Sequence, residues 1–203
     1  SDFSVRRDVG TENGTELKPE DGWLFVGDGW TVVFAVTRAF KIERSTYVDA
    51  FHRTRFALSA GEIDYVPSAR LRDALERIKA TDRTIVMLTN SSDESGWATL
   101  EYLGLNTVFD DYVFSAGKPD GMAEYMTRLE QVHGIQPAQV LSIGDHLRND
   151  IASAAKFGAA TLMVSPFRGL DRHDLGARVH TEDQLVEALY RLAEVSPVVA
   201  PAR

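Results

Sequence analysis

The stretch "LSIGDHLRNDI", Leu141–Ile151, places two carboxylates just beyond a short apolar run. The run is typical of a strand and ends at Asp145, while Asn149 and Asp150 follow where a helical pattern begins. Carboxylate and amide oxygens are the ligands that a hard cation prefers, Mg²⁺ above all. A turn at Asp145 and a helix cap at Asp150 form the alternative, but capping alone explains two acids here less well. The stretch therefore predicts a magnesium site.

Short apolar runs alternate with helical patterns around this stretch. Strand-like runs occur at Thr84–Leu88, at Asp110–Ala116, in "QVLSIGD" and in "ATLMVSP", and the last helical pattern carries Leu185, Leu189 and Leu192 on one stripe. Such alternation predicts right-handed β-α-β units and therefore a parallel sheet of the α/β class. Ligands bind beyond the carboxyl ends of strands in such sheets, so polar side chains that follow strands are the candidates for chemistry.

Capping residues mark several helix ends. The segment "GEIDYVP" is typical of a loop, and Ser68, directly after it, caps the helix that follows. Ser91 with Glu94 three residues later reads as a capping box, for a helix that ends near Gly104. Gly134 closes the helix in "DGMAEYMTRLEQVHG".

Two other strand ends carry polar residues. In "LTNSS", Thr89 leaves the strand, and Asn90 and Ser91 lead into a helix N-terminus whose free N–H groups suit an anion such as phosphate. Plain N-capping is the alternative there. In "AGKPDG", Lys118 is held by Pro119 and is able to neutralise a phosphate or orient a carboxylate, the alternative being an ordinary surface lysine.

In this order, on alternating strands and helices, the three segments resemble the haloacid dehalogenase-like superfamily of phosphohydrolases, over roughly residues 67–166. Thr89 matches the second motif of that superfamily, Lys118 in "KPDG" the third, and "GDHLRND" the fourth. The pair of acids in the fourth segment is more similar to the phosphatase branch than to the dehalogenases. The resemblance implies a Rossmann-like three-layer parallel sheet with a small helical cap insertion, Mg²⁺ and an aspartyl-phosphate intermediate.

The resemblance also implies a role for each matched residue. Thr89 would hold the transferring phosphoryl group, with Asn90 and Ser91 in the same phosphate-binding loop, and Lys118 would balance its charge. Asp145 and Asp150 would place the metal, directly or through water, with Asn149 supporting the loop. Together with Asp28, which is discussed below, Thr89 and Lys118 are the candidate catalytic residues.

The domain organisation follows from the same comparison. We expect a polar arm at residues 1–22, a Rossmann-like core at 23–36 and 67–195, a small helical cap at 37–66 and a disordered tail at 196–203. Five side chains of the cap either contact the leaving group of a substrate or serve in packing and solvation, namely Tyr47, Phe51, His52, Arg53 and Arg55. His146 and Arg168 are further candidates for substrate or anion contact.

The first motif of the superfamily departs from its pattern in this chain. That motif is an apolar strand ending in Asp-x-Asp-Gly-Thr, in which the first Asp attacks phosphorus and the second acts as acid and base. No Asp-x-Asp occurs in the 203 residues, and only "WLFVGDGWTVV", Trp23–Val33, is similar to the strand. One alignment puts Val26 at the nucleophile position. The other makes Asp28 the nucleophile and puts Trp30 at the acid-base position.

Three further considerations bear on this segment. Gly-Asp-Gly between two apolar runs is also a hairpin signal. A first motif that preceded Ser1 and was removed would leave more room for a cap. However, the first strand lies in the middle of this fold, and its loss would expose apolar faces and unpaired backbone groups of both neighbours. If the chain folds as given, Trp23–Val26 is the best candidate for that strand.

Bulk composition narrows the function classes. With a formal net charge of −8, the chain is unsuited to wrapping a nucleic-acid backbone, although local charge still permits small anions. The absence of cysteine removes disulfides, thiolate zinc sites and cysteine nucleophiles. No apolar run has the length of a membrane helix and no signal peptide opens the chain, so we expect a cytoplasmic protein. Nothing in the sequence indicates an oligomeric state.

Two functions fit these observations. The first is a Mg²⁺-dependent phosphohydrolase acting on a small phosphorylated metabolite, impaired because its nucleophile motif is not recognisable. The alternative is a non-catalytic relative that keeps an anion or Mg²⁺ pocket for binding or regulation. A receiver-like or nucleotide-binding α/β domain also fits the alternation, but it fits Lys-Pro-Asp and the two acids less well.

Overall fold

A computed structural model describes residues 33, 36–38, 40–63, 66–164 and 179–195. The expected polar arm, the segment Trp23–Val26 with Asp28, Arg168 and the expected tail lie outside these residues. The chain divides into two compact units, residues 1–41 with 118–182 and residues 42–117 with 183–203. No helix among the described residues is both long enough and apolar enough to cross a membrane.

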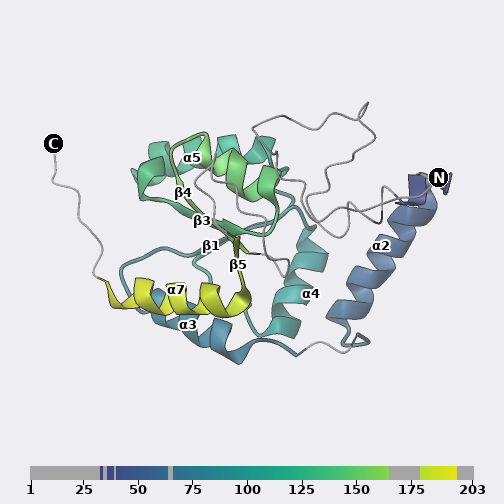
Figure 1. The fold of residues 1–203 in the computed structure, drawn as a ribbon, viewed down its shortest axis with the longest axis horizontal. Coiled ribbons are helices and arrows are strands. Elements are labelled where there is room, and N and C mark those ends of the chain that lie inside the picture. The colour runs from purple at the N-terminus through teal and green to yellow at the C-terminus, as the bar shows by residue number, and fades with distance from the viewer. Residues whose placement is uncertain (1–32, 34–35, 39, 64–65, 165–178, 196–203) are drawn as a thin grey trace. The chain divides into compact units, whose positions relative to one another are not determined.

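Helices and strands alternate along the chain (Figure 1). In the second unit they are α2 (Arg44–Ser59), α3 (Ala69–Lys79), β1 (Val86–Leu88), α4 (Asp93–Leu103), β2 (Asp111–Val113) and α7 (Glu182–Glu194), the last beginning one residue before the boundary. In the first unit they are α5 (Asp120–His133), η3 (Pro137–Gln139), β3 (Leu141–Gly144), η4 (Leu147–Ala152), α6 (Ser153–Ala155), β4 (Ala160–Val164) and β5 (Val179–His180).

The first unit contains a parallel sheet in the order β3-β4-β5. Leu141 pairs with Ala160 and Gly144 with Met163, so the expected strands in "QVLSIGD" and "ATLMVSP" are confirmed. The two-residue strand β5, which pairs with the end of β4, was not predicted. Among the described residues β3 pairs with β4 alone.

Helical segments cover this sheet with an apolar face. Leu147 and Ile151 of η4 pack with Met163 of β4, and Ile151 is fully buried. The buried side of α5 consists of Met122, Met126 and Leu129, which follow a helical period. Gly134 ends α5 in the left-handed conformation (φ 64°), as its position in the sequence predicts.

The second unit contains the parallel pair β1-β2, in which Met87 lies opposite Tyr112. Helix α4 packs against this pair through a cluster of buried residues formed by Leu100, Leu105 and Val108. Gly104 ends α4 in the left-handed conformation (φ 67°), which confirms the expected end of this helix. Helix α2 lies within the expected cap, residues 37–66, and packs against α4.

Helices α3 and α7 lie side by side in the same unit (Figure 1). Ser68 caps α3 by accepting a hydrogen bond from the Leu71 amide, as expected. The Tyr190 hydroxyl of α7 donates to Asp73 Oδ2 of α3 over 2.8 Å, and this bond is the main cause that lowers the pKa of Asp73. Arg70 of α3 binds two carboxylates of α7.

The N-terminus of α4 differs from the expected capping box. Ser92, not Ser91, is the N-cap, and its side chain accepts a hydrogen bond from the Ser95 amide. The reason is that the Ser91 hydroxyl is engaged by Arg55, a residue 36 positions earlier in the chain. A long-range contact has therefore displaced the local cap by one residue.

Gly96 permits the close approach of α4 to the segment after β2. A methyl group built on Gly96 would overlap the ring of Phe114, which packs with Trp97 and Tyr112. We expect Gly96→Ala to lower the free energy of unfolding by about 1–3 kcal/mol, because overpacking outweighs the roughly 1 kcal/mol gain in helix propensity. Urea denaturation measures this, with the exposed Glu101→Ala as a control expected within about 0.5 kcal/mol of wild type. A stabilised Gly96→Ala protein would contradict the packing described.

Candidate functional site

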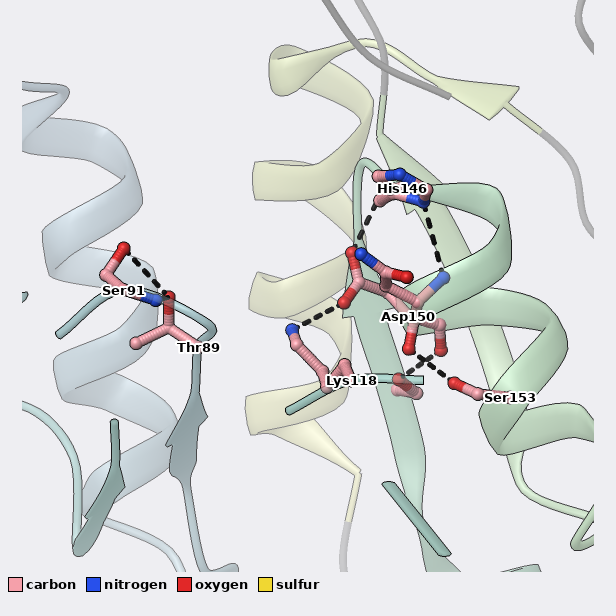
Figure 2. A network of polar contacts seen from close by, with 8 residues as sticks. Thr89, Ser91, Lys118, His146, Asp150 and Ser153 are labelled. Carbon is pink, nitrogen blue, oxygen red and sulfur yellow. Dashed lines mark hydrogen bonds and ion pairs between the residues drawn. The ribbon is translucent and has the colours of Figure 1, made fainter. Parts of the chain in front are cut away.

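An ion pair between Lys118 and Asp150 is the best-defined polar contact of the first unit (Figure 2). Lys118 Nζ lies 2.5 Å from Asp150 Oδ1, and the side chains are only 13% and 9% exposed. The other carboxylate oxygen, Oδ2, accepts the backbone N–H of His146 over 3.0 Å. Two of the three sequence motifs, the third and the fourth, are thus joined through side chains.

The backbone around Asp150 is fixed by the strand before it. The side chain of Asp150 lies directly over Gly144, where a Cβ atom would overlap the carboxylate. Ser142 of β3 donates its hydroxyl hydrogen to the Asp150 carbonyl over 2.9 Å, and Ser153 donates to the Asn149 carbonyl. Our reading of the sequence assigned none of Gly144, Ser142 and Ser153 a function, although the small residues in "LSIG" were a possible signal.

The segment that carries Asp150 is a π-helical turn, η4, rather than the start of a regular α-helix. His146 caps this turn, because its Nδ1 accepts the Asn149 amide over 3.3 Å. A neutral imidazole that accepts at Nδ1 carries its proton on Nε2. His146 therefore has a structural role as the cap of η4. A contact between His146 and the substrate, suggested by its position beside Asp145, stays a prediction.

The oxygen donors of this turn suit a hard cation in their chemistry. Asp145 is exposed, Asn149 is half-buried and Asp150 is buried, so the two acids differ in their access to solvent. Nowhere in the described part of the chain do three His, Cys, Asp or Glu side chains gather to hold a metal by themselves. Two acids are nevertheless compatible with Mg²⁺, since that ion usually keeps several waters and shares a substrate phosphate.

In the second unit, Thr89 and Ser91 form a group of hydroxyls at the end of β1. The Ser91 amide donates to Thr89 Oγ1 over 3.2 Å, and the two hydroxyl oxygens lie 3.3 Å apart (Figure 2). The backbone of this loop is tied to β2 and to the residues after it, because Thr89 N–H donates to the Val113 carbonyl and Ser115 N–H to the Ser91 carbonyl. Asn90, between them, is exposed.

Arg55 of α2 reaches this loop. Its Nη2 donates to Ser91 Oγ over 2.8 Å, and burial lowers the pKa of its guanidinium from the ordinary value. The sequence had placed Arg55 only among five residues of the expected cap. Its contact with the Thr89–Ser91 loop was not foreseen, because it joins segments 36 residues apart.

The candidate residues thus form two groups. Lys118, Asp150 and His146 belong to the first unit, and Thr89, Ser91 and Arg55 to the second. The convergence of their strand ends at one edge of a sheet stays a prediction, as does the position of Asp28, which lies outside the described residues.

Known proteins are similar to this chain in sequence and in fold. The sequence model of the family of haloacid dehalogenase-like hydrolases matches residues 23–158 of this chain. A phosphoglycolate phosphatase of Chromobacterium violaceum is 33% identical over 171 residues, which are 79% of this chain and 75% of that protein.

Two solved structures support the Rossmann-like α/β fold alone, because their sequence identity is low. A haloacid dehalogenase-like hydrolase of Streptococcus pneumoniae is 18% identical, with a TM-score of 0.57 and coverage of 85% of both chains. A hydrolase of the same family from Deinococcus radiodurans, solved with bound phosphate and sodium, is 20% identical, with a TM-score of 0.57 and coverage of 94% of this chain and 86% of that one. With the family match, the related phosphatase and this fold, the chain belongs to the haloacid dehalogenase-like hydrolases, on their phosphatase branch.

Proposed function

We propose that the protein is a Mg²⁺-dependent phosphohydrolase that cleaves a small phosphate monoester through an aspartyl-phosphate, with reduced turnover. The observation that carries the proposal is the buried pair of Lys118 and Asp150, with Asp145 exposed nearby in sequence. An ammonium group held on a buried carboxylate is a preorganised positive charge, of the kind that stabilises a transferring phosphoryl group. The partner is a small phosphorylated substrate, and the compartment is the cytoplasm.

Each described group has one part in this proposal. The hydroxyls of Thr89 and Ser91 and the exposed Asn90 bind phosphoryl oxygens. Lys118 balances their charge. Asp145, Asp150 and Asn149 hold the metal, with Asp150 acting through water because Lys118 already occupies its Oδ1. When bound, Mg²⁺ supplies further positive charge for the phosphoryl oxygens.

Asp28 is the candidate nucleophile. It is the one carboxylate in "WLFVGDGWTVV", and the family match begins within that stretch, at Trp23. Its carboxylate oxygen would bond to phosphorus as the ester oxygen leaves with its electron pair, and water would then hydrolyse the aspartyl-phosphate. Trp30 stands at the acid-base position and its indole gives up no proton to the departing alkoxide, so solvent water must do so. Turnover should therefore be slow.

The sheet of the first unit supports a strand formed by Trp23–Val26. Among the described residues β3 pairs with β4 alone, so the backbone groups of its other edge have no strand partner there. A further parallel strand is the usual partner for such an edge, because it satisfies those N–H and C=O groups.

A non-catalytic role in binding or regulation is the second candidate function. The absence of any Asp-x-Asp from the sequence favours it, because the chain then lacks the usual pair of nucleophile and acid-base carboxylates. Lys118, Thr89 and the acids of the fourth motif would still bind an anion together with Mg²⁺.

A phosphatase assay separates the two functions. Phosphoglycolate is the first substrate to test, because the related phosphatase bears that name. We expect turnover that requires Mg²⁺, that stops when EDTA is added, and that falls by about 100-fold or more in Asp28→Asn, since a missing nucleophile is not replaced by its neighbours. The exposed Asp82→Asn is the control and should retain wild-type activity.

The possible outcomes divide clearly. Activity that Asp28→Asn leaves intact would contradict Asp28 as the nucleophile. A wild-type protein that binds phosphate but turns over neither phosphoglycolate nor p-nitrophenyl phosphate would support the non-catalytic function.

Gly144 provides a test of how Asp150 is positioned. We expect Gly144→Ala to displace the Asp150 carboxylate, to raise the Mg²⁺ concentration for half-maximal activity by about 10-fold, and to cost about 1–3 kcal/mol of stability through overpacking. Gly134→Ala is the matched control, because its backbone is left-handed but the space around it is open. That variant should lose stability without any change in Mg²⁺ dependence. Equal Mg²⁺ dependence in wild type and Gly144→Ala would contradict the described packing.

A further inference from the structure

His146 is tied to the turn η4 by at least three hydrogen bonds, which lead to the same two residues (Figure 2). Its Nδ1 accepts the Asn149 N–H over 3.3 Å, and its carbonyl accepts the Asp150 N–H over 2.9 Å. Its own N–H donates to Asp150 Oδ2 over 3.0 Å. Asn149 and Asp150 are residues that the proposed function assigns to the metal, so His146 supports that site through both its side chain and its backbone.

The turn depends on side chains because its own backbone does not satisfy all of its polar groups. π-helical turns are rare, and the first N–H groups of any helix lack acceptors within it. His146 supplies the acceptor for the Asn149 N–H. Ser153 donates its hydroxyl hydrogen to the Asn149 carbonyl, and Ser142 donates to the carbonyl that follows. These three side chains therefore hold η4 together with its own backbone bonds.

The bond at Nδ1 also fixes where the His146 backbone N–H points. It spans residues 146 to 149, and the bond between the His146 carbonyl and the Asp150 N–H spans the same turn. Together they set the separation between the His146 N–H and the Asp150 carboxylate. That carboxylate is buried, with one oxygen on this N–H and the other on Lys118. Without an acceptor at Nδ1 the turn can open, and Asp150 then loses its fixed orientation.

We infer that His146 is a positioning residue for the metal site: by accepting the Asn149 N–H at Nδ1, it holds Asn149 and Asp150 in the arrangement that binds Mg²⁺. The inference rests on the proposed function, which places the metal at this turn. Contacts that orient metal ligands from behind typically contribute about 10- to 100-fold to metal affinity.

Two substitutions separate this role from a direct contact between His146 and substrate. Asparagine places an oxygen where histidine has Nδ1 and is a preferred cap residue, so His146→Asn keeps the acceptor and loses Nε2. Glutamine reaches the position of Nε2 but places no acceptor at that of Nδ1. Hydrogen exchange of the Asn149 amide in metal-free protein measures the cap itself. We expect protection in wild type and His146→Asn and faster exchange in His146→Gln, and equal protection in all three would overturn the inference.

Ser68→Ala is the matched control for the loss of a helix cap as such. Ser68 accepts the Leu71 N–H over 3.3 Å, the same distance as in the His146 cap, at the start of α3. This variant should have a lower Tm and unchanged Mg²⁺ affinity, which is also how His146→Gln would behave if its cap were merely structural. Thermal unfolding establishes that each variant is folded. His146→Ala, which also lacks the acceptor, takes the place of His146→Gln if that variant does not fold.

Calorimetric titration of Mg²⁺ in the presence of inorganic phosphate gives the affinity of each protein. We expect His146→Gln to bind at least about 10-fold more weakly than wild type, and His146→Asn and Ser68→Ala to bind as wild type does. Unchanged affinity in His146→Gln would overturn the inference. Equal weakening in His146→Gln and His146→Asn would overturn it too, because the acceptor at Nδ1 would then not be the group that matters.

Failure of the proposed function is distinguishable from failure of this inference, because turnover of phosphoglycolate is measured separately from Mg²⁺ binding. If the variants bind Mg²⁺ in the expected order but wild type hydrolyses no ester, the proposed hydrolysis is wrong and the inference holds. If wild type hydrolyses phosphoglycolate only with Mg²⁺ and all variants bind the metal equally, the inference is wrong and the proposed function stands. No Mg²⁺ binding by wild type overturns the inference.

Discussion

The buried ion pair of Lys118 and Asp150 constrains everything around it in the first unit. Both side chains are almost excluded from water, so neither charge is tolerable without the other, and removal of one partner of such a pair typically costs about 3–5 kcal/mol. The pair joins the segment before α5 to the turn after β3. Asp150 can reach Lys118 only because Gly144 has no side chain, since a Cβ atom there would overlap the Asp150 carboxylate. The Ser142 hydroxyl holds the backbone of Asp150 by donating to its carbonyl.

Much of the fold was predictable because it follows from local rules. Short apolar runs identified β1 to β4, and Ser68, Gly104 and Gly134 marked helix ends correctly, since caps depend only on nearby backbone. The strand β5 was missed because two residues carry no periodic signal. Long-range contacts were the other source of error: Arg55 takes the hydroxyl of Ser91 and leaves the cap of α4 to Ser92.

The residue types of the candidate site were predictable from the sequence, but the contacts that hold these residues in place were not. Polar residue types after strands indicated Thr89, Lys118 and Asp150, and the structure joins the last two directly. The π-helical form of η4, the capping by His146 and the approach of Arg55 depend on packing between segments, which spacing does not encode.

We propose that the turn after β3 binds Mg²⁺, and direct binding of the metal tests this proposal most closely. Calorimetric titration of Mg²⁺ in the presence of inorganic phosphate compares wild type with Asp145→Asn, a change at an exposed side chain, after thermal unfolding has established that the variant is folded. We expect one Mg²⁺ to bind per chain in wild type, with an affinity at least about 10-fold weaker in Asp145→Asn. No Mg²⁺ binding by wild type, or the same affinity in both proteins, would contradict it.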